Sequence, residues 1–272
     1  MFLTDRKLER RITELQQYRY RDIRNMEAFA VKEDHAGVVN SPLPTVFEGW
    51  DELKICNMWK GRDKFLWPHK DIEIPAEWKG KKIVGVFDYG NTGAGNNSGF
   101  ESMLYVDGEM YQGVDANHKE VFFDAALCGE KVSLTFRLWS GLEGGGVPTV
   151  QEHKIARADL AWLDEFHPIQ HELRKALDSA CHCIDWAYPG SEEFYESVHQ
   201  ADDLLNEKID AMNKDSLVNV RCVGHTHIDV AWLWRLKHTR EKCSRSFSTV
   251  LRLWSSTRNT FSYRHSRSYT NI

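Results

Sequence analysis

Val218-Asn-Val-Arg-Cys-Val-Gly-His-Thr-His-Ile-Asp-Val-Ala-Trp-Leu-Trp-Arg235 is the stretch that decides how this chain is interpreted. Its apolar first part, residues 218–223, predicts a buried strand. His225, His227 and Asp229 alternate after that run, so on an extended strand they share one face. Imidazole and carboxylate groups together suit a divalent ion such as zinc, and the carboxyl end of a strand is where ligands bind in open α/β sheets. The alternative is a strand end whose histidines only form local hydrogen bonds.

A longer stretch around these residues carries a family resemblance. It runs from His225 to Leu253 and includes Ile-Asp-Val-Ala-Trp-Leu-Trp-Arg (228–235), Lys-His-Thr-Arg-Glu-Lys (237–242) and Arg-Ser-Phe-Ser-Thr-Val-Leu-Arg-Leu (245–253). This stretch resembles the opening of the catalytic domain of glycoside hydrolase family 38, the α-mannosidases, in their bacterial or cytosolic form.

The resemblance implies a site and a reaction. His227 and Asp229 match the family's first metal motif, so they are expected to hold one divalent ion, zinc or alternatively cobalt. Trp232 is expected to pack against the mannose ring. The implied substrates are α-mannosides or mannose-containing oligosaccharides, hydrolysed with retention of configuration. The nucleophilic aspartate is expected beyond residue 272, so no catalytic residue is assigned and the chain by itself is expected to be inactive.

Two other interpretations of the motif remain open. Another metal-dependent hydrolase with a His-x-His-x-Asp motif is one: amidohydrolases begin this way, although that class does not predict Trp232 or a helix over residues 240–253. The metallo-β-lactamase pattern needs a histidine where Val230 stands. The second interpretation is a non-catalytic fragment that only binds carbohydrate.

Composition indicates the class of protein, its partners and its cellular location. Hydrophobic residues make up 42% of the 272 residues and charged residues 28%, which is typical of a globular protein. The net charge of −5 argues against a nucleic-acid partner. No apolar run predicts a membrane span and residues 1–7 lack a signal peptide's apolar region, so we expect a cytoplasmic protein. The six cysteines have no framework spacing, which favours free buried thiols.

Hydrophobic periodicity predicts an α+β multi-domain chain. Leu8, Ile12 and Leu15 recur at helical spacing, which predicts a helix over residues 4–30 in an N-terminal segment of residues 1–30. Residues 31–150 then show short β-rich runs, at 82–89, 102–109 and 131–139, with a hairpin turn at Asp107-Gly108. These runs predict a β-sandwich, and the resemblance implies that it is of the galactose-binding-like type.

The second half of the chain is predicted to be helical before the metal motif. Residues 141–148 are typical of a linker, and residues 151–217 predict a helical linker region, with helices from about 157 and a new helix start at Ser191. Residues 218–253 are expected to supply the first strand and first helix of an incomplete α/β catalytic domain. Residues 254–272 form an aberrant tail.

Aromatic residues in the β-rich part allow two interpretations. Phe65, Trp67, Trp78 and the glycine-rich loop 90–99 fit a sugar-binding surface, because aromatic rings stack on sugar faces. They fit equally well a core of aromatic side chains with one long hairpin loop.

The tail from Trp254 to Ile272 differs from everything before it. It has no acidic residue, one aliphatic residue, five serines, three threonines and three arginines. A disordered polar tail is one interpretation. A change of reading frame is the other, because back-translation one nucleotide out of register admits synonymous codons that spell a sequence resembling the family's continuation after Leu253.

The frame-change interpretation makes a prediction about the gene. Resequencing the DNA around codon 253 should show one lost or misread base, with an open frame that runs on through the rest of a mannosidase. A clean read with no homologous frame downstream would make the tail genuine.

Overall fold

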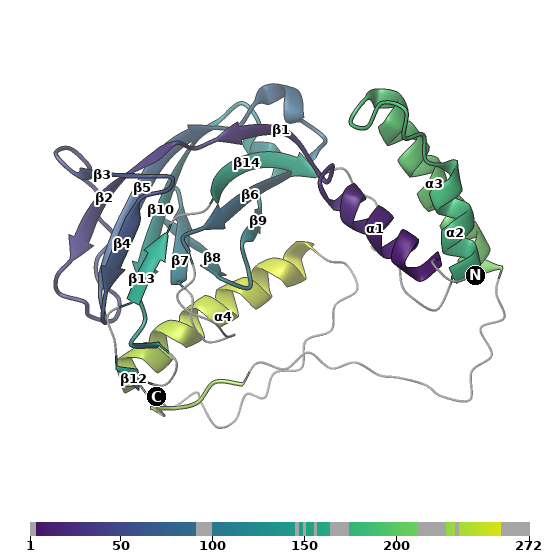
Figure 1. The fold of residues 1–272 in the computed structure, drawn as a ribbon. Helices are drawn as coiled ribbons and strands as arrows, with labels where there is room; N and C mark the ends of the chain where they lie inside the picture. The colour runs from purple at the N-terminus through teal and green to yellow at the C-terminus, as the bar shows by residue number, and fades with distance from the viewer. Residues whose placement is uncertain are drawn as a thin grey trace. The chain divides into compact units, whose positions relative to one another are not determined.

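The structure is a computed structural model that describes residues 4–90, 100–144, 147–148, 151–154, 157–163, 174–211, 227–231 and 234–256. The chain divides into two compact units, shown with their element labels in Figure 1. The helical unit draws on Met1–Asp22 and Trp162–Val220, and the β-rich unit draws on Ile23–Ala161 and Arg221–Ile272. No helix in the described ranges combines the length and the apolar composition needed to cross a membrane.

The β-rich unit contains two main sheets. The antiparallel six-stranded sheet has the order β3-β2-β5-β10-β7-β8. Its strands are β2 (Ala28–Asp34), β3 (Asp51–Lys54), β5 (Phe65–Glu73), β7 (Glu101–Val106), β8 (Glu109–Asp115) and β10 (Lys131–Trp139). The four-stranded sheet has the order β1-β14-β6-β9. Its strands are β1 (Tyr20–Asn25), β6 (Lys82–Asp88), β9 (Glu120–Phe122) and β14 (Arg157–Leu163).

Short elements complete the unit. Two further strand pairs are β4 with β13 and β11 with β12. Their bounds, with those of two 3-10 turns, are β4 (Met58–Gly61), β11 (Glu143–Gly144), β12 (Val147–Pro148), β13 (Gln151–Lys154), η1 (Ala76–Trp78) and η2 (Ala125–Leu127).

The three β-rich runs and the hairpin turn were predicted correctly. Strands β6, β7 and β10 occupy them, and Val106 pairs with Glu109 across the turn. Asp107 has φ 51° and Gly108 has φ 84°, the left-handed conformation that a two-residue hairpin turn needs at both positions. The largely β architecture therefore follows from β-rich runs and turn chemistry that are visible in the sequence.

Aromatic side chains fill the space between the two sheets. Phe136 of β10 lies with its ring centroid 4.8 Å from that of Phe87 on β6 and 5.2 Å from that of Tyr89, so the two sheets face each other across these rings. Phe29 of β2 contacts both Phe136 and Tyr89. All four side chains are at most 1% exposed, and their burial is the main apolar contribution to this core.

The other face of the six-stranded sheet carries a buried charge. Arg137 follows Phe136 on β10, so its side chain lies on the opposite face, and it is only 7% exposed. Its guanidinium forms ion pairs with Asp34 and Glu241 and donates to the carbonyl of Val38 at 2.7 Å. It also lies 4.3 Å from the centroid of the Phe65 ring. Burying a cation is tolerated here because opposite charges and an acceptor surround it.

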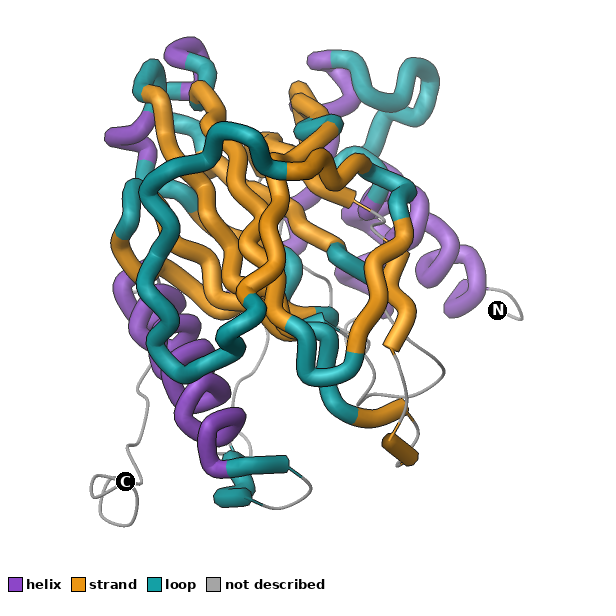
Figure 2. The backbone as a smooth tube through the Cα atoms, turned by 90° about the vertical axis from the view of Figure 1, so that its left-hand side faces the viewer, coloured by secondary structure: helices purple, strands orange, loops and turns teal. Residues whose placement is uncertain are grey.

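Helix α4 (Leu236–Ser256) covers this outer face beside β7 and β8, as Figures 1 and 2 show. The residues that bond to the sandwich are polar and recur every three or four positions. They are His238, Glu241, Arg245, Thr249 and Arg252, and their partners are Asp63, Arg137, Glu101, Gly113 and Tyr111 in the same order. The helix is therefore attached by hydrogen bonds and ion pairs.

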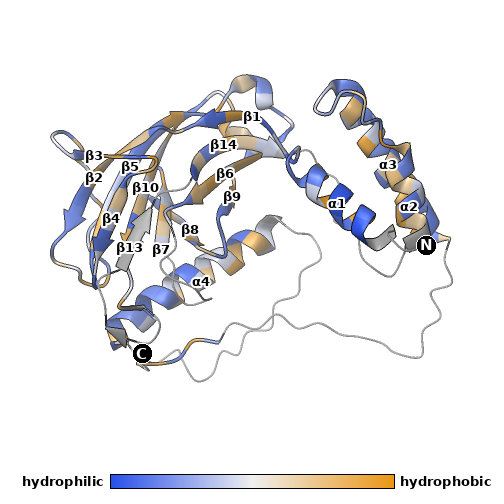
Figure 3. Ribbon diagram, in the orientation of Figure 1, coloured by the Kyte–Doolittle hydropathy of each residue, from blue (hydrophilic) through white to orange (hydrophobic). Residues whose placement is uncertain are grey.

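The opposite side of α4 is apolar and exposed. Figure 3 shows hydrophilic and hydrophobic residues alternating along this helix. Its exposed large apolar side chains on that side are Leu236 at 38%, Phe247 at 55%, Leu251 at 54% and Trp254 at 45%. An amphipathic surface helix ordinarily buries its apolar stripe. Helix α4 instead turns its polar side toward the sandwich and leaves its apolar side exposed.

A glycine allows α4 to lie close to β8. A Cβ placed on Gly113 would come within 2.9 Å of both the carbonyl oxygen of Arg245 and Oγ1 of Thr249. The Gly113 amide donates to that same Oγ1 at 3.1 Å. Any larger residue at this position would push the helix away from the strand.

The predicted N-terminal helix is too long. Helix α1 (Thr4–Gln16) ends where the spacing of Leu8, Ile12 and Leu15 ends, and most of residues 20–30 belong to β1 and β2 instead. The amide of Met26 donates to the carbonyl of Ala158 at 3.0 Å, so these strands are defined by partners far away in the sequence. Such partners are invisible to local periodicity.

The boundary between sandwich and helical region was also placed wrongly. Residues 143–144 and 147–148 pair as β11 and β12, and β13 and β14 follow where helices were expected. Leu160 is 3% exposed and Ala161 is fully buried in β14, which lies next to β1 and β6. The expected strand 218–223 lies outside the described residues. The expected helix 240–253 is confirmed as α4, which extends to Ser256 rather than ending near Leu253.

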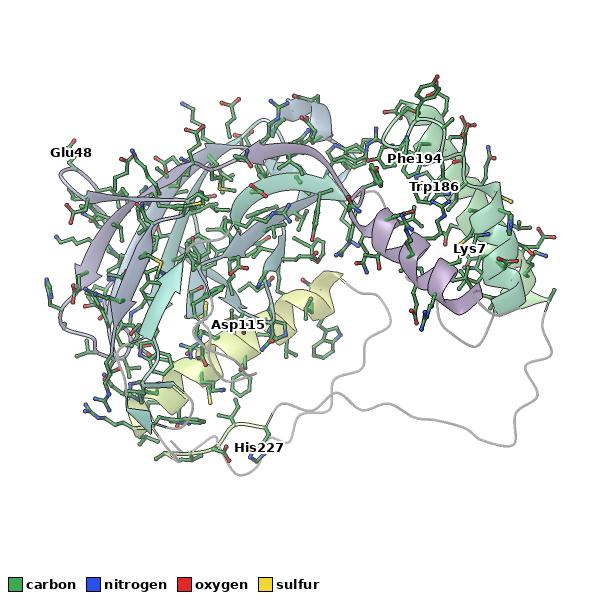
Figure 4. All side chains as sticks on the ribbon, in the orientation of Figure 1. Lys7, Glu48, Asp115, Trp186, Phe194 and His227 are labelled. Atoms are coloured by element: carbon green, nitrogen blue, oxygen red, sulfur yellow. The ribbon has the colours of Figure 1, made fainter. Side chains whose placement is uncertain are left out.

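The helical unit has a small core of its own. Helices α1, α2 (Arg174–Cys183) and α3 (Glu192–Asp210) share a cluster of buried apolar residues. Phe194, labelled in Figure 4, is 1% exposed and contacts Tyr18 and Trp186. The predicted helix start is confirmed, because the Ser191 side chain accepts a hydrogen bond from the Phe194 amide at 3.2 Å.

The cysteines were predicted correctly in one respect. The five that lie in described residues are free thiols: Cys56, Cys128, Cys181, Cys183 and Cys243. None of these five is fully buried, and Cys56 and Cys183 are exposed, so the expected burial is wrong.

The buried ion pair between Arg137 and Glu241 should dominate the attachment of α4. Glu241→Ala leaves a buried guanidinium short of one anionic partner, so we expect a loss of about 3–5 kcal/mol in the free energy of unfolding. Glu52→Ala is the matched control, because the Glu52–Lys54 pair is 58% and 59% exposed, and solvent screening leaves such a pair little effect on stability. Urea denaturation followed by tryptophan fluorescence measures both, and equal losses would contradict the prediction.

Candidate metal centre

The two predicted metal ligands lie together in the segment that precedes α4. His227 Nε2 is 2.7 Å from Asp229 Oδ1, and the two side chains are 71% and 38% exposed. Figure 4 labels His227 on this segment. The described residues 227–231 are irregular rather than extended strand. His225 and Trp232 lie outside the described residues, so their predicted roles stay predictions.

The segment is held in place by Thr239 in the first turn of α4. Its hydroxyl oxygen accepts hydrogen bonds from the Ala231 amide at 3.1 Å and from the Trp234 indole Nε1 at 3.0 Å. It donates to the Asp229 carbonyl at 3.3 Å. Thr239 is 3% exposed, and all three bonds are partly buried. Ala231 has φ 51°, a conformation that a non-glycine residue keeps only when its surroundings impose it.

Asp63 ties the first turn of α4 to the β-sandwich. Its Oδ1 accepts from His238 Nε2 at 2.7 Å and from Trp139 Nε1 at 3.1 Å, while its Oδ2 lies 3.0 Å from Lys237 Nζ. The His238 ring also stacks on Trp139 with centroids 5.0 Å apart. Asp63 therefore fixes His238, and with it the neighbouring Thr239.

The protonation state of His238 follows from its partners. Its Nδ1 accepts a hydrogen bond from the Arg235 amide at 3.1 Å, so the proton of the neutral ring sits on Nε2 and is donated to Asp63. Burial lowers the pKa of His238, against the opposing effect of Asp63. Burial acts to raise the pKa of Asp63, but hydrogen bonds from Lys237 and His238 outweigh it and the pKa lies below its ordinary value. The pair is thus a neutral imidazole and a carboxylate.

The donor set at residues 227–231 fits a divalent ion in its chemistry. One imidazole nitrogen and one carboxylate oxygen face each other and are open to solvent, and these are ligands that zinc accepts. No group of three histidine, cysteine, aspartate or glutamate side chains that could hold a metal occurs among the described residues. The described part of the chain therefore offers two ligands.

The aromatic residues proposed as a sugar-binding surface are core residues. Phe65 is 1% exposed, Trp67 is 4% exposed and Trp78 is 2% exposed. Phe65 and Trp67 lie beneath the Arg137 guanidinium on the outer face of β5. The alternative interpretation as core aromatics is correct for these three residues, and residues 91–99 of the loop lie outside the described residues.

Sequence reasoning missed the residues that hold the segment. His238 and Thr239 were quoted as part of a motif but received no role, although a threonine and a histidine in a helix's first turn are frequent hydrogen-bonding residues. Asp63 lies 175 positions before His238 and carries no local signal. Only the folded chain brings it to α4.

Comparison with known proteins points to one family. The profile described as the "Glycosyl hydrolases family 38 N-terminal domain" matches residues 217–271. Alpha-mannosidase G of Dictyostelium discoideum is 57% identical over 219 residues, which cover 68% of this chain and 19% of that protein. Alpha-mannosidase 2C1 of Mus musculus is 25% identical over 215 residues, which cover 69% and 20%. This chain thus spans about one fifth of the length of these relatives.

The matched range also bears on the tail. It includes residues 254–271. If the reading frame had shifted after Leu253, these residues would not be expected to match the family. The frame change therefore stays a prediction that the DNA sequence has to decide.

Solved structures add little. A β-glucuronidase from Ruminococcus gnavus has a TM-score of 0.35 and 12% identity, covering 54% of this chain and 30% of that one. A Faecalibacterium prausnitzii β-glucuronidase has a TM-score of 0.34 and 11% identity, covering 52% and 31%. Scores this low support no inference about function.

The His238–Asp63 contact predicts how stability depends on pH. Because the folded chain lowers the pKa of His238 below 6.5, the unfolded chain binds the proton more readily. The stabilisation is complete above that value and is lost as the pH falls through the folded-state pKa. Asp63 acts with the same sign, but only below its ordinary value of 3.8.

We therefore expect the melting temperature to fall as the solution is acidified from about pH 7.5 to about pH 5.5. His238→Asn should remove part of this dependence, whereas His35→Asn, at a side chain that is 84% exposed, should leave it unchanged. Identical pH profiles for the parent chain and His238→Asn would show that His238 is not the titrating group.

Proposed function

Because this chain belongs to glycosyl hydrolase family 38, we propose that it is the part of an α-mannosidase that carries the first metal-binding motif. His227 and Asp229 provide two ligands, and Trp232 lines the subsite for the reacting mannose. The observation that carries the proposal is the contact between His227 and Asp229 at 2.7 Å, inside the range that the family profile matches.

The proposed reaction is the retaining hydrolysis of terminal α-mannosides. A divalent ion, zinc or alternatively cobalt, would supply Lewis-acid stabilisation at the hydroxyls of the reacting sugar. The part played by this chain is to orient the His227 imidazole and the Asp229 carboxylate toward that position. The nucleophile and acid/base carboxyl groups that a retaining glycosidase needs are proposed to come from other parts of the enzyme, so the 272-residue chain alone should not turn over substrate.

The β-sandwich has a supporting role in this proposal. We assign it to the galactose-binding-like type and take its function to be holding α4, the first helix of the α/β catalytic domain. Two observations support this role: the polar side of α4 bonds to the sandwich, and its apolar side stays exposed. A helix with two such sides suits a position between the sandwich and a second apolar partner, here the rest of the catalytic domain.

A purely carbohydrate-binding function is less well supported. Its sequence evidence was a group of aromatic side chains, and Phe65, Trp67 and Trp78 are buried.

The cytoplasm is the proposed location. The free thiols of the five described cysteines are what a reducing compartment would maintain.

The proposal predicts the effect of removing a ligand. In a form of the protein that continues through a family 38 catalytic domain, His227→Ala should lower kcat/KM for 4-nitrophenyl α-mannoside by at least about 100-fold and should release most bound metal. His35→Ala, at an exposed histidine outside the segment, is the matched control.

If His227→Ala kept both its activity and its metal, the assignment of His227 as a metal ligand would be wrong. The same substrate tests the chain as given: hydrolysis by the purified 272-residue protein would contradict its proposed dependence on further residues.

A further inference from the structure

We propose that Thr239 is a positioning residue whose hydroxyl sets the approach of His227 and Asp229 to a divalent cation. The inference rests on the proposed function, because it concerns the same two ligands. It means that α4 and the sandwich influence metal affinity through one side chain, which touches neither the cation nor the sugar.

The Thr239 hydroxyl has its full complement of partners. A hydroxyl donates one hydrogen bond and accepts two. Here it donates to the Asp229 carbonyl and accepts from the Ala231 amide and the Trp234 indole. Asp229 and Ala231 belong to the ligand segment and Trp234 comes shortly before α4, so one oxygen atom links the ligand segment to both ends of its connection with the helix.

The backbone of the segment needs such a restraint. Asp229 carries a ligand carboxylate, and its own carbonyl is one of the three partners of Thr239. Two residues later Ala231 has φ 51°, and it is the amide of this residue that donates to Thr239. Without the hydroxyl, Ala231 would be free to relax to a common conformation and would carry Asp229 with it.

Thr239 itself is held firmly. It is 3% exposed, and its neighbour His238 is 2% exposed and bonded to Asp63. The amides of His238 and Thr239 both donate to the Arg235 carbonyl, at 2.9 and 3.4 Å, so the first turn of α4 is closed. Restraint thus passes from Asp63 in the sandwich, through the first turn of α4, to the backbone of Asp229.

Threonine suits this role better than serine. Its β-branch restricts χ1, which keeps the hydroxyl directed at its partners. Valine has the same shape without the hydroxyl. Thr239→Val therefore removes all three hydrogen bonds while keeping the packing, and Thr239→Ser keeps the bonds while loosening the rotamer.

The test measures cation affinity in the 272-residue chain, not activity. Co²⁺ is titrated into isotopically labelled protein, and the dissociation constant is read from the paramagnetic broadening of the His227 ring signals. Thr239→Val should raise this constant on the order of tenfold, the usual effect of losing a group that orients a ligand. Thr239→Ser should stay within about threefold. The Trp234 indole N–H signal should shift in Thr239→Val and not in Thr239→Ser, which reports the geometry without any metal.

Two controls separate the possible failures. Asp229→Asn removes a ligand directly, so an unchanged Co²⁺ constant in this variant would overturn the metal site and with it the proposed function. If Asp229→Asn weakens binding but a folded Thr239→Val does not, the metal site stands and the positioning role of Thr239 is wrong.

Should Thr239→Val fail to fold, Trp234→Phe tests the same network by removing one of its three bonds. It should weaken Co²⁺ binding by a smaller factor, about threefold. An unchanged constant there, together with an unchanged constant in Thr239→Ser, would overturn the positioning role.

Discussion

The buried guanidinium of Arg137 is the interaction on which the arrangement of the β-rich unit depends. It stands on β10, one of the two central strands of the six-stranded sheet, and bonds at once to Asp34, to the Val38 carbonyl and to Glu241 of α4. A buried cation is costly unless its partners surround it, so the segment after β2 and the helix must both close over it. The charge thus sets where α4 lies on the sheet more than it adds to stability.

Helix α4 owes its direction to this polar attachment. A purely apolar contact would tolerate sliding along the sheet, because hydrophobic burial is non-directional. The row of bonds made by His238, Glu241, Arg245, Thr249 and Arg252 has one register only. Gly113 lets the helix approach closely enough for that register to form. A defined position of α4 matters because its first turn holds the ligand segment through Thr239.

The candidate metal centre was partly predictable. His227 and Asp229 are two positions apart, so their proximity follows from the chain itself and was foreseen from the motif. His238 and Thr239 were visible as part of the same motif, but their partners were not. Asp63, which fixes them, lies in the connection between β4 and β5 and contacts α4 only in the folded chain. No periodicity in the sequence around Asp63 indicates that contact.

The sequence by itself determined the elements whose cause is local. The β-rich runs of β6 and β10, the Asp107-Gly108 turn and the capping Ser191 each depend on residues a few positions apart, and all were predicted. Tertiary structure decided the rest. Residues 20–25 and 157–163 became strands because they lie next to each other in one sheet across more than a hundred positions, although helices were predicted for both segments. Likewise, the ion pair with a buried arginine on β10 determines which side of α4 faces the sandwich. Such contacts depend on which surfaces meet after folding, and that information is distributed over the whole chain.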